Sequence, residues 1–189
     1  MRLFVALVPP AQALAELARA VEPLRAAWPS LRWAGRERWH VTLAFLGAVE
    51  PGKLDNLTER LSRAAGRHQA VELHVGPGGA FPSPGRARVV YARIDGERQA
   101  LAALSALAAS VAAGARRAGA PPPDEGRRYR PHVTLARSKQ PTDLGPLVAA
   151  LGDFSGMAWD ATTVELIKSQ TGRLTKYEAI GNWPLRAPA

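Results

Sequence analysis

The sequence predicts an α+β protein with a single domain built from two similar halves. The tetrapeptide His-Val-Thr-Leu occurs twice, at residues 40–43 and 132–135, and both copies alternate polar and apolar residues as a half-buried β-strand does. Strands and amphipathic helices follow one another in a similar order in both halves. With 189 residues, of which 47% are hydrophobic, the chain is long enough for one well-buried core.

The first half predicts a strand, a helix, a strand, a helix and a strand. Leucine and valine at helical spacing identify the helices, and alternating or continuous apolar runs identify the strands. Pro23 is expected to kink or end the first helix, because proline has no backbone N–H to donate. In chain order the expected elements are residues 3–8, 11–27, 40–46, 53–67 and 71–75.

The second half repeats this order after a stretch rich in glycine and proline. Residues 76–86 are expected to be a loop that connects the halves, because Gly76, Pro77, Gly78 and Gly79 interrupt regular structure. The elements that follow are residues 88–94, 98–118, 132–136, 144–151, 164–167 and 177–180, the last two paired around a turn near Gly172. We expect one domain over residues 1–189 that arose by internal duplication, with lobes at about 1–80 and 81–189. Strand exchange between the lobes is left open.

Charge and composition favour an anionic partner. The formal net charge is +9, and positive surface potential concentrates polyanions, nucleic acid foremost. The alternative is that many arginines simply form a solvated surface, since Arg, Ala, Gly and Pro are all plentiful. The absence of cysteine excludes disulfides, thiolate nucleophiles and cysteine-bound zinc, and suits a cytoplasmic location. The apolar run at the N-terminus is too short to span a membrane, so no membrane partner is expected.

The repeated motif can supply a matched pair of catalytic imidazoles. In each copy His and Thr share one face of the strand, while Val and Leu share the other. If the two strands are neighbours, a proton donor, a proton acceptor and two hydroxyls converge on one space, which suits phosphoryl chemistry. No carboxylate falls within either motif and no metal-ligand spacing is present, so we expect no metal and no cofactor. The glycines of residues 76–85 also lack the Lys-Ser pair of a nucleotide-triphosphate loop.

The chain resembles the two-histidine (2H) phosphoesterases, and among them the prokaryotic RNA 2',3'-cyclic phosphodiesterases, also called 2'-5' RNA ligases. The resemblance covers nearly the whole length. Besides the two motifs it includes the runs at residues 1–7, 31–33, 39–47, 81–84, 130–137 and 177–185. It implies a fold of two pseudo-symmetric lobes, each an antiparallel sheet backed by helices, with the motif strands lining a central cleft.

The resemblance also implies an activity: hydrolysis of a terminal 2',3'-cyclic phosphate of RNA to a 2'-phosphate, without a metal and with reversible 2'-5' joining as a further option. By family analogy His132 is the proton acceptor for the attacking water and His40 the proton donor to the leaving 3'-oxygen. Thr42 and Thr134 would donate hydrogen bonds to the non-bridging oxygens.

Four further residues are expected to bind substrate. Arg137 lies five residues after His132, an odd offset on a straight strand, so we expect it at or beyond the strand end, where its guanidinium can reach the phosphate. Arg130 belongs to a basic approach with Arg127 and Arg128, suited to flanking phosphates or simply to solvent. Tyr129 and Phe45 are candidates to stack on a base, and the alternative for Phe45 is packing in the core or at a strand edge.

Two other functions remain open. One is a binding module for RNA or nucleotides that catalyses nothing, although such a site would not need two proton-transfer groups. The other is the same chemistry on a small cyclic nucleotide or an ADP-ribose cyclic phosphate. The expected partner is RNA ending in a 2',3'-cyclic phosphate, with tRNA fragments as one candidate, and the expected protein is a monomer without an obligate protein partner.

Overall fold

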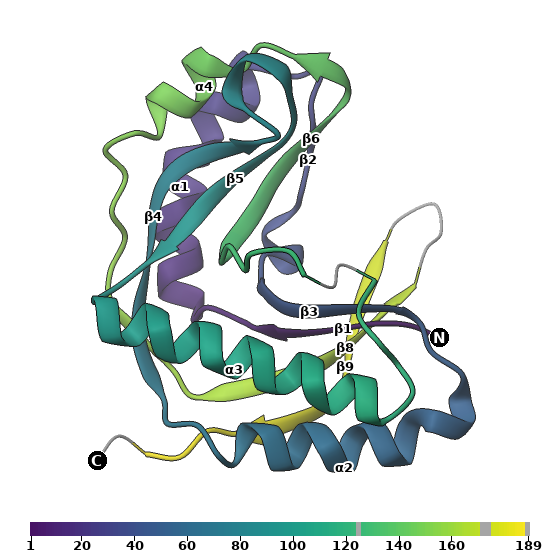
Figure 1. Cartoon of the computed structure of the whole chain (residues 1–189). Helices are drawn as coiled ribbons and strands as arrows, with labels where there is room; N and C mark the ends of the chain where they lie inside the picture. Colours follow the sequence, from purple (N-terminus) through teal and green to yellow (C-terminus); the bar gives the residue numbers. More distant parts are fainter. Residues whose placement is uncertain (124–125, 171–174, 188–189) are drawn as a thin grey trace.

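A nine-stranded sheet forms the centre of the computed structural model, which describes residues 1–123, 126–170 and 175–187 (Figure 1). Every pairing between these strands is antiparallel. The strands are β1 (Arg2–Leu7), β2 (Arg32–Trp33), β3 (Val41–Ala48), β4 (Val71–Phe81), β5 (Ala87–Asp95), β6 (His132–Thr142), β7 (Trp159–Ala161), β8 (Thr163–Gln170) and β9 (Lys176–Pro184). Their order is β7-β4-β5-β6-β3-β1-β8-β9, and β2 pairs with β6.

The helices cover one face of this sheet. They are α1 (Ala11–Ala27), α2 (Leu54–Ala65), α3 (Arg98–Arg117) and α4 (Gly145–Ala150), with short 3-10 helices at Arg36–Arg38, Pro51–Lys53 and Pro84–Arg86. Figure 1 shows α1 alongside β4 and β5, and α2 and α3 side by side next to the other strands. Strand β1 shows the division between the two faces, because Leu3, Val5 and Leu7 lie in the main core while Phe4 and Ala6 join a separate small cluster.

The sheet consists of two parts that meet at one point. In Figure 1 the strands β4, β5 and β6 run obliquely to β3 and β1. Strands β3 and β6 join the two parts through a single residue pair, Val41 with Val133. The mixed α+β class with antiparallel strands and helices is thus as expected from the sequence.

The two parts of the sheet do not follow the sequence division near residue 80, for which strand exchange was left open. Residue 80 lies inside β4, which pairs with β5 across the supposed boundary. The C-terminal strands β8 and β9 pair with each other, and β8 pairs with the N-terminal β1. Each part of the sheet therefore combines strands from both halves of the sequence, which is the arrangement that strand exchange produces.

The expected loop over residues 76–86 is wrong for its first half. Strand β4 continues through Gly76–Gly79 to Phe81, with an irregular register between Val75 and Gly78. The glycines serve close packing rather than a turn. A Cβ on Gly79 would lie only 2.5 Å from Cζ of the Tyr91 ring, and a Cβ on Gly78 only 2.7 Å from Cβ of Leu151.

Most helices match the expected ranges to within a few residues, and α1 continues to Ala27 despite Pro23. Proline leaves one carbonyl without its intrahelical partner, but the buried side chains of Val21 and Leu24 hold this turn against the core. The expected strands at residues 164–167 and 177–180 pair with each other as part of β8 and β9. The turn expected near Gly172 lies outside the described residues.

Helix α3 is, among the described residues, the one helix that is long and apolar enough to cross a membrane by length and composition alone. Its leucines and valine at positions 104, 107 and 111 are buried in the main core. The helix also packs against α2, β3 and β4. Packing within this domain therefore accounts for its apolar stripe.

Candidate active site

The two motif strands place four polar side chains on one face of the sheet. Val41 and Val133, paired across β3 and β6, are both 0% exposed and belong to the main core. Their neighbours along each strand point to the opposite face, away from the helices. We call this surface, which carries His40, Thr42, His132 and Thr134, the motif face.

Register determines how these four side chains are arranged. Because the strands are antiparallel and Val41 lies opposite Val133, His40 is placed across from Thr134 and Thr42 across from His132. The two histidines therefore lie on a diagonal, for which neighbouring residues are roughly 7–8 Å apart in a regular sheet and their Cβ atoms somewhat less. Both imidazoles therefore lie on the same sheet face, one on each strand of the Val41–Val133 pair.

The same hydrogen bond fixes the tautomer of both imidazoles. Nδ1 of His40 donates to the carbonyl oxygen of Arg38 at 2.7 Å, and Nδ1 of His132 donates to that of Arg130 at 2.6 Å. A carbonyl oxygen can only accept, so Nδ1 carries the hydrogen in each ring. Nε2 is then the nitrogen that can accept or transfer a proton at the motif face, and the two rings are equivalent in this respect.

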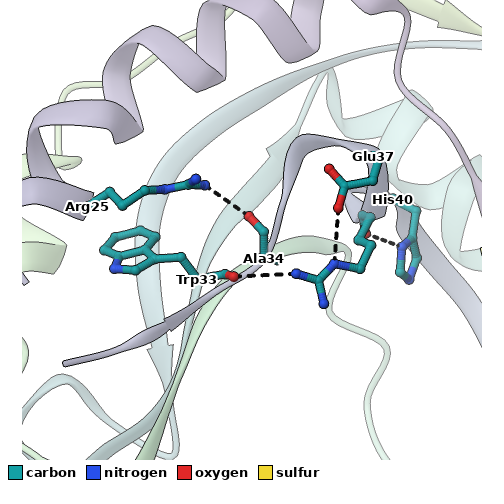
Figure 2. A network of polar contacts seen from close by, with 6 residues as sticks. Arg25, Trp33, Ala34, Glu37 and His40 are labelled. Carbon is teal, nitrogen blue, oxygen red and sulfur yellow. Dashed lines mark hydrogen bonds and ion pairs between the residues drawn. The ribbon is translucent and has the colours of Figure 1, made fainter. Parts of the chain in front are cut away.

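The carbonyl that holds His40 belongs to a polar network shown in Figure 2. The Arg38 guanidinium lies 3.5 Å from the carbonyl oxygen of Trp33 and 3.4 Å from a carboxylate oxygen of Glu37. Arg25 donates to the carbonyl oxygen of Ala34 at 3.1 Å.

This segment is also bound to the second motif strand. The backbone N–H of Ala34 donates to the carbonyl oxygen of Leu135 at 2.8 Å, and Trp33 pairs with Ala136. The residues that orient His40 are therefore attached directly to β6, the strand that carries His132.

A phenylalanine and a tyrosine flank each imidazole. The His40 ring lies 4.6 Å from the Phe4 ring and 5.4 Å from the Tyr177 ring, measured between centroids. The His132 ring lies 5.1 Å from both its aromatic neighbours, Phe81 and Tyr91. These aromatic rings restrict the orientation of the imidazoles and shield them from water.

Sequence reasoning did not identify these aromatic residues. They come from four different strands, β1, β9, β4 and β5. No local pattern connects them with the motifs. Three of them, Phe4, Phe81 and Tyr177, lie in runs that carry the family resemblance, which did not single them out as site residues. For Tyr91 the available signal was the Gly-Gly pair in β4, because the missing side chain of Gly79 admits its ring.

Burial lowers the pKa of both histidines. The pKa of His40 falls from 6.5 to about 4, chiefly because burial disfavours the charged ring; the bond to Arg38 acts against this shift, and the positive charge of His132 adds to it. Burial is also the main cause of the lowered pKa of His132, where the charge of Arg137 contributes further and the bond to Arg130 opposes it. Without an anion both rings are therefore neutral at pH 7.

Each motif is followed by a β-bulge, which changes the sheet face to which the following side chains point. The register between β5 and β6 shifts after Thr134, so Leu135 and Ala136 are both buried and Arg137 lies opposite Val89. Arg137 thus shares the motif face with His132 but lies within β6, not at or beyond its end as expected.

The corresponding bulge in β3 places Phe45 on the motif face. The register shifts between Thr42 and Ala44, so Phe45 pairs with Phe4. Its ring packs against the small cluster of Phe4, Ala6 and Ile167, and the Arg2 guanidinium lies 5.4 Å from its centroid. The contacts of Phe45 are therefore packing contacts with this cluster, and its stacking on a base stays a prediction.

Arg32 is a second basic residue beside the motifs that the sequence did not single out. It lies on β2 directly opposite Arg137, and both side chains are exposed. Like charges directly across a strand pair repel each other, so an anion between them would stabilise this arrangement. The signal available in the sequence was only the Leu-Arg-Trp run at residues 31–33.

Tyr129, a candidate for stacking on a base, makes contacts within the protein. Its ring packs against the main core, and its hydroxyl donates to the carbonyl oxygen of Thr42 at 3.1 Å. Burial raises the pKa of this hydroxyl well above its ordinary value. Tyr129 therefore fastens the segment before β6 to the first motif strand.

Arg130 contributes to the site through its backbone. Its carbonyl oxygen holds His132, while its side chain is exposed next to the motif face.

Within the described ranges, no group of three or more His, Cys, Asp or Glu side chains is placed to hold a metal ion. The chemistry available at the motif face thus consists of two Nε2 atoms, two hydroxyls and nearby guanidinium groups.

This arrangement, with two His-x-Thr motifs meeting on one sheet face, defines a two-histidine phosphoesterase. A model of the 2'-5' RNA ligase superfamily matches residues 8–173, and the chain belongs to that family.

Relatives and solved structures agree with this assignment. An RNA 2',3'-cyclic phosphodiesterase of Geobacillus stearothermophilus is 30% identical over 163 residues, which are 83% of this chain but 48% of the relative, so the chain spans about half of that protein. One of Aeropyrum pernix is 30% identical over 140 residues, 74% of this chain and 76% of the relative.

The fold is shared with proteins of known structure. TT0787 of Thermus thermophilus is 25% identical with a TM-score of 0.77, and the match covers 100% of both chains. LigT of E. coli in its apo form is 26% identical with a TM-score of 0.73, covering 98% of this chain and 97% of LigT. These matches extend over both parts of the sheet.

Proposed function

We propose that the protein is an RNA 2',3'-cyclic phosphodiesterase that converts a terminal 2',3'-cyclic phosphate into a 2'-phosphate. One observation carries the proposal: two imidazoles with Nε2 available lie on one sheet face, diagonally across the Val41–Val133 pair. The printed names of the relatives support the substrate class.

In the proposed reaction the two histidines act on opposite sides of phosphorus. Nε2 of His132 accepts a proton from water as the water oxygen forms a bond to phosphorus. The bond between phosphorus and the 3'-oxygen breaks, and Nε2 of His40 protonates that oxygen. The products are a 2'-phosphate and a free 3'-hydroxyl, and one proton has moved from His40 to His132 by way of the substrate.

The environment of each ring supports this division of roles. The positive charge of Arg137 disfavours the protonated form of His132, as an acceptor requires. His40 is neutral in the empty site and needs the negative charge of the bound phosphate to hold its proton. An anion beside the ring raises its pKa, so substrate binding itself prepares the donor.

The threonines are proposed to bind the non-bridging oxygens. Within the described part of the chain, neither the Thr42 nor the Thr134 hydroxyl has a hydrogen-bond partner, so each is free to donate. Each lies across from the histidine of the other motif. Hydrogen bonds from these hydroxyls would stabilise the charge that builds on phosphorus oxygens in the transition state.

The same site would support joining of RNA ends. If a 5'-hydroxyl replaces water, attack on the cyclic phosphate with loss of the 3'-oxygen forms a 2'-5' phosphodiester. No additional group is needed, because the proton transfers are the same. The proposed ligation is therefore the same mechanism with a different nucleophile.

The test is hydrolysis of RNA that ends in a 2',3'-cyclic phosphate, in the presence of a chelator, with the position of the product phosphate determined. We expect 2'-phosphate from the wild type and from the matched control His74→Asn. We expect none from His40→Asn or His132→Asn, in which the amide can still donate to the backbone carbonyl. RNA that binds tightly but is not hydrolysed by the wild type would instead support a binding module. Hydrolysis of ADP-ribose cyclic phosphate alone would indicate a small-molecule enzyme.

A further inference from the structure

A groove between α2 and α3 collects four arginine side chains on the helical side of the protein. Its volume is about 340 Å³, and Arg60, Arg63, Arg67 and Arg117 line it together with small residues. The motif face lies on the other side of the sheet, since α2 and α3 pack against the main core. The groove is therefore separate from the candidate active site.

Small residues create the space for this groove. Gly114 of α3 has no side chain, and a Cβ there would lie 3.4 Å from the carbonyl oxygen of Arg60, so the two helices approach closely at this point. Ala64 and Ala113 line the walls without filling them. The long arginine side chains thus surround a recess in which a charged group can be reached from several directions.

The charges of the groove are only partly compensated. Arg63 pairs with Glu59, and Nε of Arg60 donates to the side-chain oxygen of Asn56 at 3.1 Å. Arg67 and Arg117 have no carboxylate partner within the described residues, and α3 contains no Asp or Glu. Four like charges around one recess repel one another, and a bound anion relieves this cost.

The positive charges near the groove also act on a neighbouring histidine, His68. The pKa of His68 is lowered, first by burial and then by the charges of Arg186 and Arg67. His68 also contacts Ser110, a residue of the groove, through Nε2 at 2.8 Å.

We infer that this groove between α2 and α3 binds backbone phosphates of RNA, away from the reacting end. Arg60 and Arg63 lie in the last two turns of α2, Arg67 follows in the turn after the helix end, and all three line the groove. Guanidinium groups along such a groove match successive phosphates of a strand.

The sequence carries further exposed arginines between the groove and the second motif. From Arg117 at the end of α3, the chain passes the exposed residues Arg127, Arg128 and Arg130 before it reaches His132. The groove and the motif face are separated by the thickness of the sheet and one helix layer, roughly 20 Å. An RNA must pass around both layers to occupy the two sites at once. Short substrates therefore use the motif face alone, whereas long ones also use the groove. This inference rests on the proposed RNA substrate.

The test compares two variants that each lose two positive charges. Arg67→Gln/Arg117→Gln changes the groove, and Arg19→Gln/Arg98→Gln is the matched control, because both sets of side chains are exposed and lie outside the motif face. Binding of an RNA of about 30 nucleotides that ends in a 2'-phosphate is measured at several salt concentrations. Turnover is measured separately with a dinucleotide 2',3'-cyclic phosphate.

For the groove variant we expect roughly tenfold weaker binding of the long RNA. The slope of log K against log salt should also be smaller in magnitude by about 1.4, because each of the two lost phosphate contacts contributes about 0.7. Its kcat/KM on the dinucleotide should equal that of the wild type. Equal loss of affinity in both variants, or no loss in the groove variant, would overturn the inference. Failure of the wild type to hydrolyse the dinucleotide would instead reject the proposed function and leave the comparison of RNA affinities intact.

Discussion

Replacing His40 by asparagine should make the protein less sensitive to acid. In the native state burial lowers the pKa of His40 from 6.5 to about 4. The unfolded chain then binds a proton at this position at a higher pH than the folded chain does. Protonation of the unfolded chain draws the equilibrium towards unfolding, so the wild type loses stability as the pH falls through this range.

The size of the effect follows from the two pKa values. A fall from 6.5 to about 4 corresponds to about 3 kcal/mol of unfolding free energy. None of it is lost above about pH 7, and all of it is lost below about pH 4, where both states are protonated. Asparagine does not titrate, and its amide can still donate to the Arg38 carbonyl as Nδ1 of the imidazole does.

The assay is denaturant unfolding of the wild type and of His40→Asn at a series of pH values between these limits. Relative to the wild type, the variant should gain about 3 kcal/mol between neutral and acid pH, whatever its stability at neutral pH. A constant difference between the two proteins over the whole range would refute the reasoning. It would mean that the His40 ring is not buried as described.

Three further predictions concern the residues around the histidines. Thr42→Val and Thr134→Val should each lower kcat/KM by roughly 10- to 1,000-fold, since a donor to the transition-state charge is lost. Arg137→Gln should raise the pKa of His132, because a positive charge nearby is removed, and should move the acid limb of the pH profile of kcat/KM to higher pH. Tyr129→Phe should cost about 1 kcal/mol of unfolding free energy through loss of its bond to Thr42, measured by denaturant unfolding.

Each of these predictions has a contradicting outcome. Unchanged turnover in both threonine variants would remove the hydroxyls from the proposed mechanism. An acid limb that stays in place in Arg137→Gln would show that the guanidinium does not act on His132. An unfolding midpoint of Tyr129→Phe equal to that of the wild type would show that the hydroxyl makes no useful bond in solution.

The local parts of the site could be predicted from the sequence because they depend on neighbouring residues. Alternation along a strand places His40 with Thr42, and His132 with Thr134, on one face whatever the rest of the fold does. The recurrence of the same tetrapeptide indicated that the two strands act together. Their contact at Val41 and Val133 satisfies that expectation.

The remainder depends on contacts between distant segments. Bulges after the two motifs bring Arg137 and Phe45 to the motif face. These bulges depend on the register with β5 and β1, so the residue pattern of one strand alone does not predict them. Likewise the sequence around Gly79 predicts a loop, whereas in the structure this glycine leaves space for the Tyr91 ring of the neighbouring strand.

The most direct test of the central claim is an NMR titration of the two active-site imidazoles with and without a 2'-nucleotide, the product of the proposed reaction. If both Nε2 atoms face one phosphate, the ligand raises the pKa of His40 and of His132 together, because each ring then lies beside the same negative charge. A ligand that moves the pKa of one ring and leaves the other unchanged would contradict a shared phosphate site.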